Sequence, residues 1–259
     1  MILLQPTAQS RGDYLNFART HSLGLELMDF AFPVILKNDS MAQALYSKYD
    51  GVLVRAFHGP FVDLNYSGGD DEIFEISKRR IRKCASHAYA MGVRGIVIHS
   101  CFFPTLTRDD PLYAMWSEEA AVLLRSVAEE YNVGFFIENV LDMTPDIISM
   151  MVREANHPCV KVCLDIGHAN LSRTSLEGWM EALHEHIVHV HLSDNNAFYD
   201  DHIALGTGSV DCGKFDRLAK FYRLKADYTI EVKPFGAVTA SFEYIKENMP
   251  YVFTEGSKA

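Results

Sequence analysis

The stretch VKVCLDIGH, residues 160–168, is an apolar run that ends on two residues able to bind a divalent metal, Asp165 and His168. Five other short apolar runs end in the same way: FHGP (57–60) at His58, VIHS (97–100) at His99, FIEN (136–139) at Glu138, HVHLSD (189–194) at His191 and TIEVKP (229–234) at Glu231. A parallel barrel gathers the C-terminal ends of all its strands around one mouth. The six runs therefore predict one pocket.

These runs are near-continuous instead of alternating, which is typical of parallel strands buried on both faces. We expect eight strands, at residues 2–5, 23–30, 51–58, 95–99, 133–138, 160–165, 187–192 and 226–232. Helical periodicity lies between them, at 13–20, 40–49, 71–91, 117–131, 145–155, 175–184, 214–222 and 239–247. Thr144 and Ser175 have the residue types that cap helix N-termini.

The strict alternation of strands and helices predicts the α/β class and a single (β/α)8 TIM barrel domain over residues 1–259. Barrels of about 250 residues commonly form one domain, and no Pro/Gly/Ser-rich linker or repeat divides this chain. The alternative is an open, doubly wound sheet. Such a sheet would leave the ligand-type residues far apart on its strands, whereas a barrel explains why they would meet.

Composition limits the partners that we expect. The 259 residues are 48% hydrophobic and 22% charged, with a formal net charge of -10. This negative charge argues against a polyanion as the main partner, since nucleic-acid binding usually requires a basic surface. The basic run KRRIRK (78–83) is interpreted as a solvated helix face. No window approaches the roughly 18 apolar residues of a membrane span, so we expect a cytoplasmic protein without a membrane partner.

Four of the strand-end residues form a mixed set of carboxylates and an imidazole: Glu138, Asp165, His191 and Glu231. Such a set suits Mn²⁺, Mg²⁺, Zn²⁺ or Co²⁺. A divalent ion polarises a carbonyl or hydroxyl group, while carboxylates nearby move protons. Five more candidate ligands bring the total to nine: His58, His99 and His168, with Asp200 and His202 in the loop YDDHIALGTG (199–208). His189 shares strand parity with His191, and we interpret it as a packed histidine that supports the site.

Taken together, HGP, IHS, IEN, LDIGHAN, HVHLSD, DDHIALGTG and IEV resemble the motifs of the xylose isomerase-like barrel superfamily. This superfamily joins sugar isomerases and epimerases with the endonuclease IV group of DNA repair enzymes. The resemblance extends from His58 to Glu231, and the motifs are specific only as a set.

The isomerase and epimerase branch of the resemblance implies one metal held by Glu138, Asp165, His191 and Glu231. Glu138 and Glu231 would also be the acid and base that return and remove a proton beside a carbonyl. The substrate would be a sugar or a sugar phosphate.

The endonuclease IV branch implies three zinc ions. Their ligands would be His58, His99 and Glu138 for the first; Glu138, Asp165, His191 and Glu231 for the second; and His168, Asp200 and His202 for the third. The chemistry would then be phosphoester hydrolysis at abasic sites in DNA.

We rank the isomerase or epimerase first, because the net charge is negative and the loop FVDLNYSGGDDE (61–72) is acidic. A DNA-facing loop is usually basic, although Phe61 has the character of an aromatic wedge. Gly206 and Gly208 suit either tight turns or phosphate binding, and tight turns are the simpler interpretation. The sequence leaves open the sugar, the metal and the oligomeric state, a homo-oligomer included.

Overall fold

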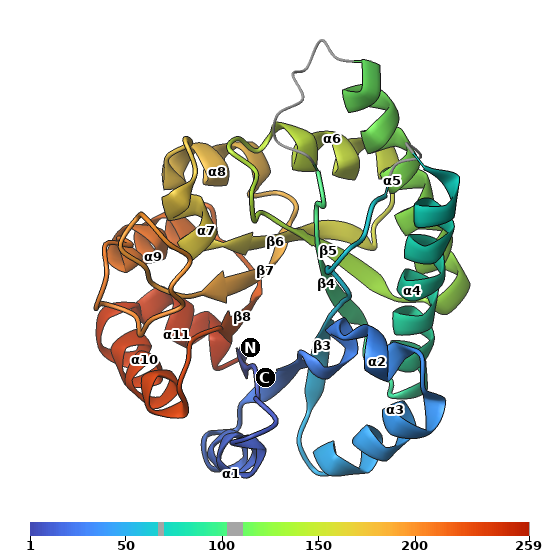
Figure 1. Ribbon diagram of the computed structural model, residues 1–259. Helices are drawn as coiled ribbons and strands as arrows, with labels where there is room; N and C mark the ends of the chain where they lie inside the picture. Colours follow the sequence, from blue (N-terminus) through green and yellow to red (C-terminus); the bar gives the residue numbers. More distant parts are fainter. Residues whose placement is uncertain (67–69, 103–110, 259) are drawn as a thin grey trace.

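The computed structural model describes residues 1–66, 70–102 and 111–258. Eight parallel strands form a closed barrel in the order β1 to β8, and helices surround it (Figure 1). The predicted single-domain (β/α)8 barrel is confirmed. The strands are β1 (Ile2–Leu4), β2 (Gly24–Leu27), β3 (Val54–His58), β4 (Gly95–His99), β5 (Gly134–Glu138), β6 (Val160–Asp165), β7 (Ile187–Leu192) and β8 (Asp227–Ile230).

The helices that follow the strands pack their apolar faces on the outside of the barrel. They are α1 (Arg11–His21), α2 (Pro33–Leu36), α3 (Asp39–Tyr46), α4 (Asp71–Ala90), α5 (Pro111–Tyr131), α6 (Asp146–Ala155), α7 (Ile166–Leu171), α8 (Leu176–Leu183), α9 (Cys212–Phe221), α10 (Phe235–Asn248) and α11 (Pro250–Gly256), with the 3-10 turns η1 (Asp29–Ala31) and η2 (Ser47–Tyr49). None of the helices within the described ranges is long and apolar enough to cross a membrane.

Two predicted strand boundaries were wrong, and one helix was not predicted, in places that matter for the site. The second strand ends at Leu27 instead of residue 30, because the chain turns into η1. The last strand ends at Ile230, so Glu231 lies one residue beyond it. The short helix α7, which the sequence pattern did not predict, begins directly after β6 because the Asp165 carboxylate accepts a hydrogen bond from the His168 N–H at 2.7 Å and caps it.

The two predicted caps had different outcomes. Ser175 caps α8, since its hydroxyl accepts a hydrogen bond from the Gly178 N–H at 3.2 Å. Thr144 does not cap α6, where Pro145 occupies the N-cap position. The Thr144 hydroxyl instead donates to the Asp146 carboxylate at 2.9 Å.

The register of the parallel strands brings candidate ligands side by side. His99 on β4 pairs with Glu138 on β5, and Asp165 on β6 pairs with His191 on β7. Glu231 is held at the same level because its backbone N–H donates to the Leu192 carbonyl at 3.0 Å. Strand pairing alone therefore places these ligands at one end of the barrel.

Candidate metal centre

All nine candidate ligands lie at the C-terminal mouth of the barrel. Six are at or next to the ends of β3 to β8, His168 is in α7, and Asp200 and His202 are in the loop after β7. Within the described residues they form three groups, each with ligand atoms within 4.8 Å of one another. We name these groups the inner centre (Glu138, Asp165, His191, Glu231), the histidine group (His58, His99, Glu138) and the loop group (His168, Asp200, His202).

The inner centre is closed to solvent, with relative exposures of 0% for Asp165 and His191 and 6% for Glu231. Its atoms converge on one nitrogen. His191 Nδ1 lies 2.7 Å from Glu231 Oε2 and 3.1 Å from Glu138 Oε1, with Asp165 Oδ2 at 3.9 Å. Four ligand atoms from four strand ends thus surround one small volume.

The other two groups lie on either side of Glu138. In the histidine group, the Nε2 atoms of His58 and His99 lie 3.5 and 3.3 Å from Glu138 Oε2. In the loop group, Asp200 Oδ2 lies 3.2 Å from His168 Nε2 and 3.0 Å from His202 Nε2. The structure selects Asp200 over Asp201 for this group.

Several ligands are oriented by hydrogen bonds from the atoms that face away from the site. His58 Nδ1 donates to the Gly59 carbonyl at 3.1 Å, and His202 Nδ1 donates to the Glu231 carbonyl at 2.8 Å, so each presents Nε2 to its group. Asp165 uses Oδ1 to cap α7, which leaves Oδ2 turned inward. Such partners fix the ring orientation and tautomer of metal-binding histidines.

Four buried ligand atoms make no hydrogen bond within the described part of the chain: Glu138 Oε2, Asp165 Oδ2, Glu231 Oε2 and His168 Nδ1. Buried polar atoms in proteins nearly always have a partner, and an unpaired one indicates a missing ion or water. Three of the four are carboxylate oxygens, which suit a hard or borderline divalent cation. The residues present therefore fit a metal ion.

The electrostatics of the centre also favour a cation. Burial acts to raise the pKa of Glu138, but the nearby imidazoles of His191, His168 and His58 outweigh it and hold this pKa well below its ordinary value. Burial raises the pKa of Asp165 to about 6. His191 shows the converse: burial acts to lower its pKa, yet Cys163, Glu231, Glu26 and Glu138 raise it well above the ordinary value. A buried excess of anions is costly unless it is compensated.

The loop that carries Asp200 and His202 is folded by Asp194, from the HVHLSD run. Asp194 Oδ2 accepts hydrogen bonds from the backbone N–H groups of Gly206 at 3.0 Å and Gly208 at 2.9 Å. A Cβ on Gly208 would lie 2.4 Å from the Asn195 carbonyl oxygen, so this close approach requires glycine. These N–H groups are occupied, which supports the tight-turn interpretation of the two glycines over phosphate binding.

Two residues of the site were missed by the sequence reasoning: Glu26 on β2 and Gln5 after β1. Both are buried. Glu26 Oε2 lies 2.7 Å from His189 Nε2, and Gln5 Nε2 donates to Glu231 Oε1 at 3.0 Å. A charged residue inside the apolar run GLEL (24–27) was the signal for Glu26, and it was overlooked because it does not end its run. His189 is buried and packed against the site, as the strand parity predicted.

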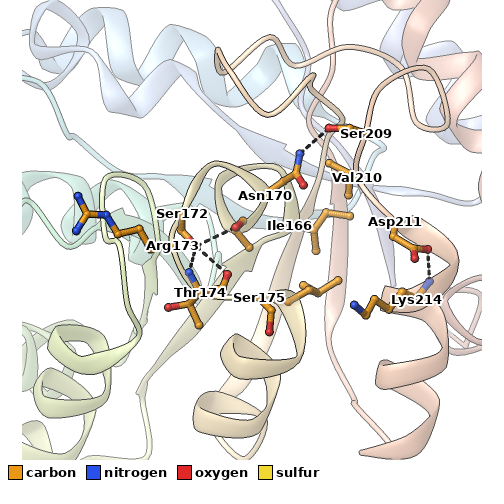
Figure 2. A pocket seen from close by; sticks show the side chains of 12 residues that line it. Ile166, Asn170, Ser172, Arg173, Thr174, Ser175, Ser209, Val210, Asp211 and Lys214 are labelled. Carbon is orange, nitrogen blue, oxygen red and sulfur yellow. Dashed lines mark hydrogen bonds between the residues drawn. The ribbon is translucent and has the colours of Figure 1, made fainter.

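A polar cavity of about 420 Å³ lies beside the mouth, lined by α7, the start of α8 and the segment before α9 (Figure 2). Most of its polar side chains bond to one another or to the backbone. Asn170 Nδ2 donates to the Ser209 hydroxyl at 3.0 Å, and Asp211 Oδ1 accepts from the Lys214 N–H at 2.8 Å (Figure 2). This cavity therefore differs from the inner centre in having most of its polar groups paired.

Comparison with known proteins identifies the family. The sequence profile of the xylose isomerase-like TIM barrel family matches residues 17–248. The chain belongs to the xylose isomerase-like TIM barrel family. The match spans all the candidate ligands, so the nine residues lie within the part of this xylose isomerase-like chain that defines the family.

The proteins similar to this chain include both uncharacterised and crystallised ones. The uncharacterized protein MJ1311 of Methanocaldococcus jannaschii is 26% identical over 237 residues, which cover 83% of this chain and 76% of that protein. A D-tagatose 3-epimerase-like protein superposes with a TM-score of 0.81 at 22% identity, over 98% of both chains. The TTHB071 protein from Thermus thermophilus, in crystals soaked with ZnCl2, gives a TM-score of 0.78 at 23% identity, over 96% of this chain and 98% of that one.

Proposed function

We propose that this protein is a divalent-metal-dependent isomerase or epimerase of a sugar or sugar phosphate. The observation that carries the proposal is the inner centre, where two buried glutamates, each with an unpaired carboxylate oxygen, flank the same nitrogen of His191. Family membership and the likeness to a D-tagatose 3-epimerase-like protein support a sugar as the substrate.

Glu138, Asp165, His191 and Glu231 would hold the ion. When bound, it would polarise the carbonyl and hydroxyl oxygens of the sugar and so acidify the C–H bond beside the carbonyl. One of the two glutamates removes the proton from that carbon, and the electron pair of the C–H bond moves toward the carbonyl oxygen. The other glutamate, which has taken up a proton from solvent, gives that proton to the opposite face of the same carbon, and the carbonyl re-forms. If the proton instead goes to the neighbouring carbon, the hydroxyl proton of that carbon passes to the former carbonyl oxygen, and the carbonyl group moves by one carbon.

The surrounding residues suit this chemistry. The lowered pKa values of Glu138 and Glu231 favour the ionised form, which the glutamate that accepts the proton needs. The burial of the inner centre restricts water, which would otherwise weaken the interaction between the glutamates and the substrate. The Phe61 ring stacks on His99 with centroids 4.6 Å apart, and it forms an apolar wall beside the histidine group.

The test is deuterium uptake from D2O into a panel of ketoses and ketose phosphates, measured by NMR with Mn²⁺ or Co²⁺ added. We expect exchange at a carbon beside the carbonyl of at least one sugar, and loss of exchange in Glu231→Gln. The exposed Glu247 supplies a matched control, Glu247→Gln, which should exchange like the native protein. Metal-loaded protein that leaves every sugar unexchanged and unconverted would contradict the proposal.

A three-metal phosphoesterase is the second candidate. The specific observation in its favour is that all nine ligand-type residues gather into three groups that share or adjoin Glu138. The nine residues of the three groups would hold the ions, which would supply an activated water for phosphoester hydrolysis and stabilise the charge that develops at the phosphate. This function would be established instead if the protein cleaves an abasic-site DNA duplex in a zinc-dependent way and exchanges deuterium into no sugar of the panel.

A further inference from the structure

Below the inner centre, on the side away from the mouth opening, the barrel interior holds a carboxylate that the mechanism above does not use. Glu26, on β2, is 0% exposed and lies among side chains from β7 and β8. A buried carboxylate is costly unless hydrogen bonds compensate it. The identity of its partners shows what this residue does.

One oxygen of Glu26 meets three donors. Oε2 lies 2.7 Å from His189 Nε2, 3.1 Å from His191 Nε2 and 2.7 Å from the Thr229 hydroxyl. An ionised carboxylate only accepts hydrogen bonds, so both imidazoles must carry a proton on Nε2. Together the histidines hold the pKa of Glu26 well below its ordinary value against the opposing effect of burial.

The consequence for His191 follows from its ring geometry. With its Nε2 proton donated to Glu26, His191 presents Nδ1 to the two glutamates and Asp165 of the inner centre. Metal binding requires a neutral imidazole with its lone pair facing the ion, and a proton held on Nε2 by Glu26 leaves Nδ1 as the nitrogen that provides this lone pair. The wrong tautomer would direct an N–H group at the ion.

Gln5 extends the same network to a second ligand. Its Nε2 donates to Glu231 Oε1 at 3.0 Å and to Glu26 Oε1 at 3.4 Å. Because Oε1 of Glu231 is engaged, Oε2 is the oxygen left unpaired and facing His191. Two of the four inner-centre ligands are thus oriented from the same buried group.

We propose that Glu26 is a positioning residue, which fixes the tautomer of His191 and, through Gln5, the orientation of Glu231 for metal binding. This inference rests on the metal-binding part of the proposed function and is independent of the sugar chemistry. It assigns to β2 a role in the site, although no candidate ligand lies on that strand.

The affinity test uses Co²⁺ alone, titrated into the metal-free full-length protein and followed by visible absorption. Glu26→Gln keeps the shape of the side chain but directs an amide at the imidazoles, so we expect Co²⁺ affinity to fall roughly 10- to 100-fold. The matched control is Asp142→Asn. Asp142 is also a buried acid, but its carboxylate accepts a hydrogen bond from the Ser100 hydroxyl at 2.9 Å instead of contacting a ligand of the inner centre. This control should bind Co²⁺ like the native protein.

A second measurement needs no variant and therefore does not depend on the folding of Glu26→Gln. Long-range ¹H–¹⁵N spectra of the Zn²⁺-loaded native protein should show the His191 proton on Nε2 and the metal on Nδ1. The opposite tautomer, or native Co²⁺ affinity in a folded Glu26→Gln, would overturn the positioning role. If the native protein binds no Co²⁺, the proposed function is overturned as well. If it binds Co²⁺ but no sugar of the panel exchanges deuterium, only the sugar chemistry is contradicted and the positioning role of Glu26 is unaffected.

Discussion

The inner centre and the loop group are built from the same kinds of side chain, yet they differ in burial and in pairing. The inner centre is closed, and three of its carboxylate oxygens make no hydrogen bond within the described residues. In the loop group, the Asp200 side chain is 42% exposed and already bonded to both His168 and His202. Two histidines serve the single carboxylate of the loop group, whereas the inner centre places three carboxylates around one imidazole.

The pKa values express the same difference. Burial acts to raise the pKa of Asp200, but the bonds to His168 and His202 lower it far more. Burial likewise acts to lower the pKa of His202, while Asp200, Glu231 and Asp165 raise it to about 9. Protonated histidines can therefore stand in for a metal at the loop group. From this comparison we infer that the inner centre is the tighter of the two candidate metal sites, and the predictions below test this from the largest effect to the smallest.

The largest effect is expected at Glu138, which belongs to both the inner centre and the histidine group. Glu138→Gln removes a proton carrier and a shared metal ligand without changing side-chain shape. Because positioned acid–base groups contribute roughly 10²- to 10⁴-fold to rate, we expect a loss of deuterium exchange in that range. If the rate of deuterium exchange in Glu138→Gln stays within 10-fold of the native rate, Glu138 does not transfer the proton in the reaction.

Asp165 allows its two roles to be separated. Asn is as good an N-cap as Asp, so Asp165→Asn should keep α7 folded while removing an anionic ligand. We expect Co²⁺ affinity to fall by more than the roughly 10- to 100-fold typical of a supporting residue. Asp165→Ala, which also removes the cap, should in addition lose about 1 kcal/mol of stability. Equal Co²⁺ affinity in Asp165→Asn and native protein would exclude Asp165 as a ligand.

Removal of the metal should destabilise the whole barrel, because the inner-centre ligands come from four different strand ends. An ion present at 100 times its dissociation constant stabilises the folded state by about 2.7 kcal/mol. For a chain of this size, that corresponds to a Tm about 5–10 °C lower after chelation. Thermal unfolding followed by circular dichroism, with and without added Mn²⁺, measures the shift. A chelator-insensitive Tm would contradict a structural coupling between metal and fold.

A smaller effect is expected from the loop group. Asp200→Asn should change the Co²⁺ affinity of the inner centre and the rate of sugar exchange by less than about 10-fold, since pairing within the loop group involves partly exposed charges. The same variant sharpens the choice between functions. If the native protein cleaves a phosphoester but exchanges no sugar, and Asp200→Asn loses the cleavage, the three-metal phosphoesterase is favoured.

The smallest functional effect is expected beside the polar cavity of Figure 2, at the cap of α8. Ser175→Ala removes the hydrogen bond from the Gly178 N–H and should cost about 1 kcal/mol of stability. Metal affinity and exchange rate should stay at the native level. A loss of either would mean that this cavity belongs to the functional site.

The sequence predicted the barrel and the meeting of the six strand-end candidate ligands because strand-end positions follow directly from buried apolar runs. The barrel topology then brings these positions together, because parallel strands that close a barrel all have their C-terminal ends at one mouth. Residues such as Asp165 and His191 could therefore be placed without any knowledge of distances.

Glu26 and Gln5 could not be found in the same way. Glu26 lies in the middle of a run, and only the closed barrel brings it across to His189 and His191 on β7. Gln5 looks like an ordinary residue after a strand until its amide is seen to reach Glu231. Long-range polar contacts across a barrel interior depend on register and side-chain direction, which a run of apolar residues does not reveal. Asp194 could not be found from the sequence pattern either. It holds the loop of Asp200 and His202 by accepting hydrogen bonds from backbone N–H groups, which an apolar run does not reveal.

The most direct test of the distinction between the two regions is metal stoichiometry. Elemental analysis of the native protein, purified without chelator, should find about one tightly held divalent ion per chain. That ion should be lost in Asp165→Asn and retained in Asp200→Asn. Three zinc ions per chain, with one or more lost in Asp200→Asn, would contradict the account and make the loop group a metal site equal to the inner centre.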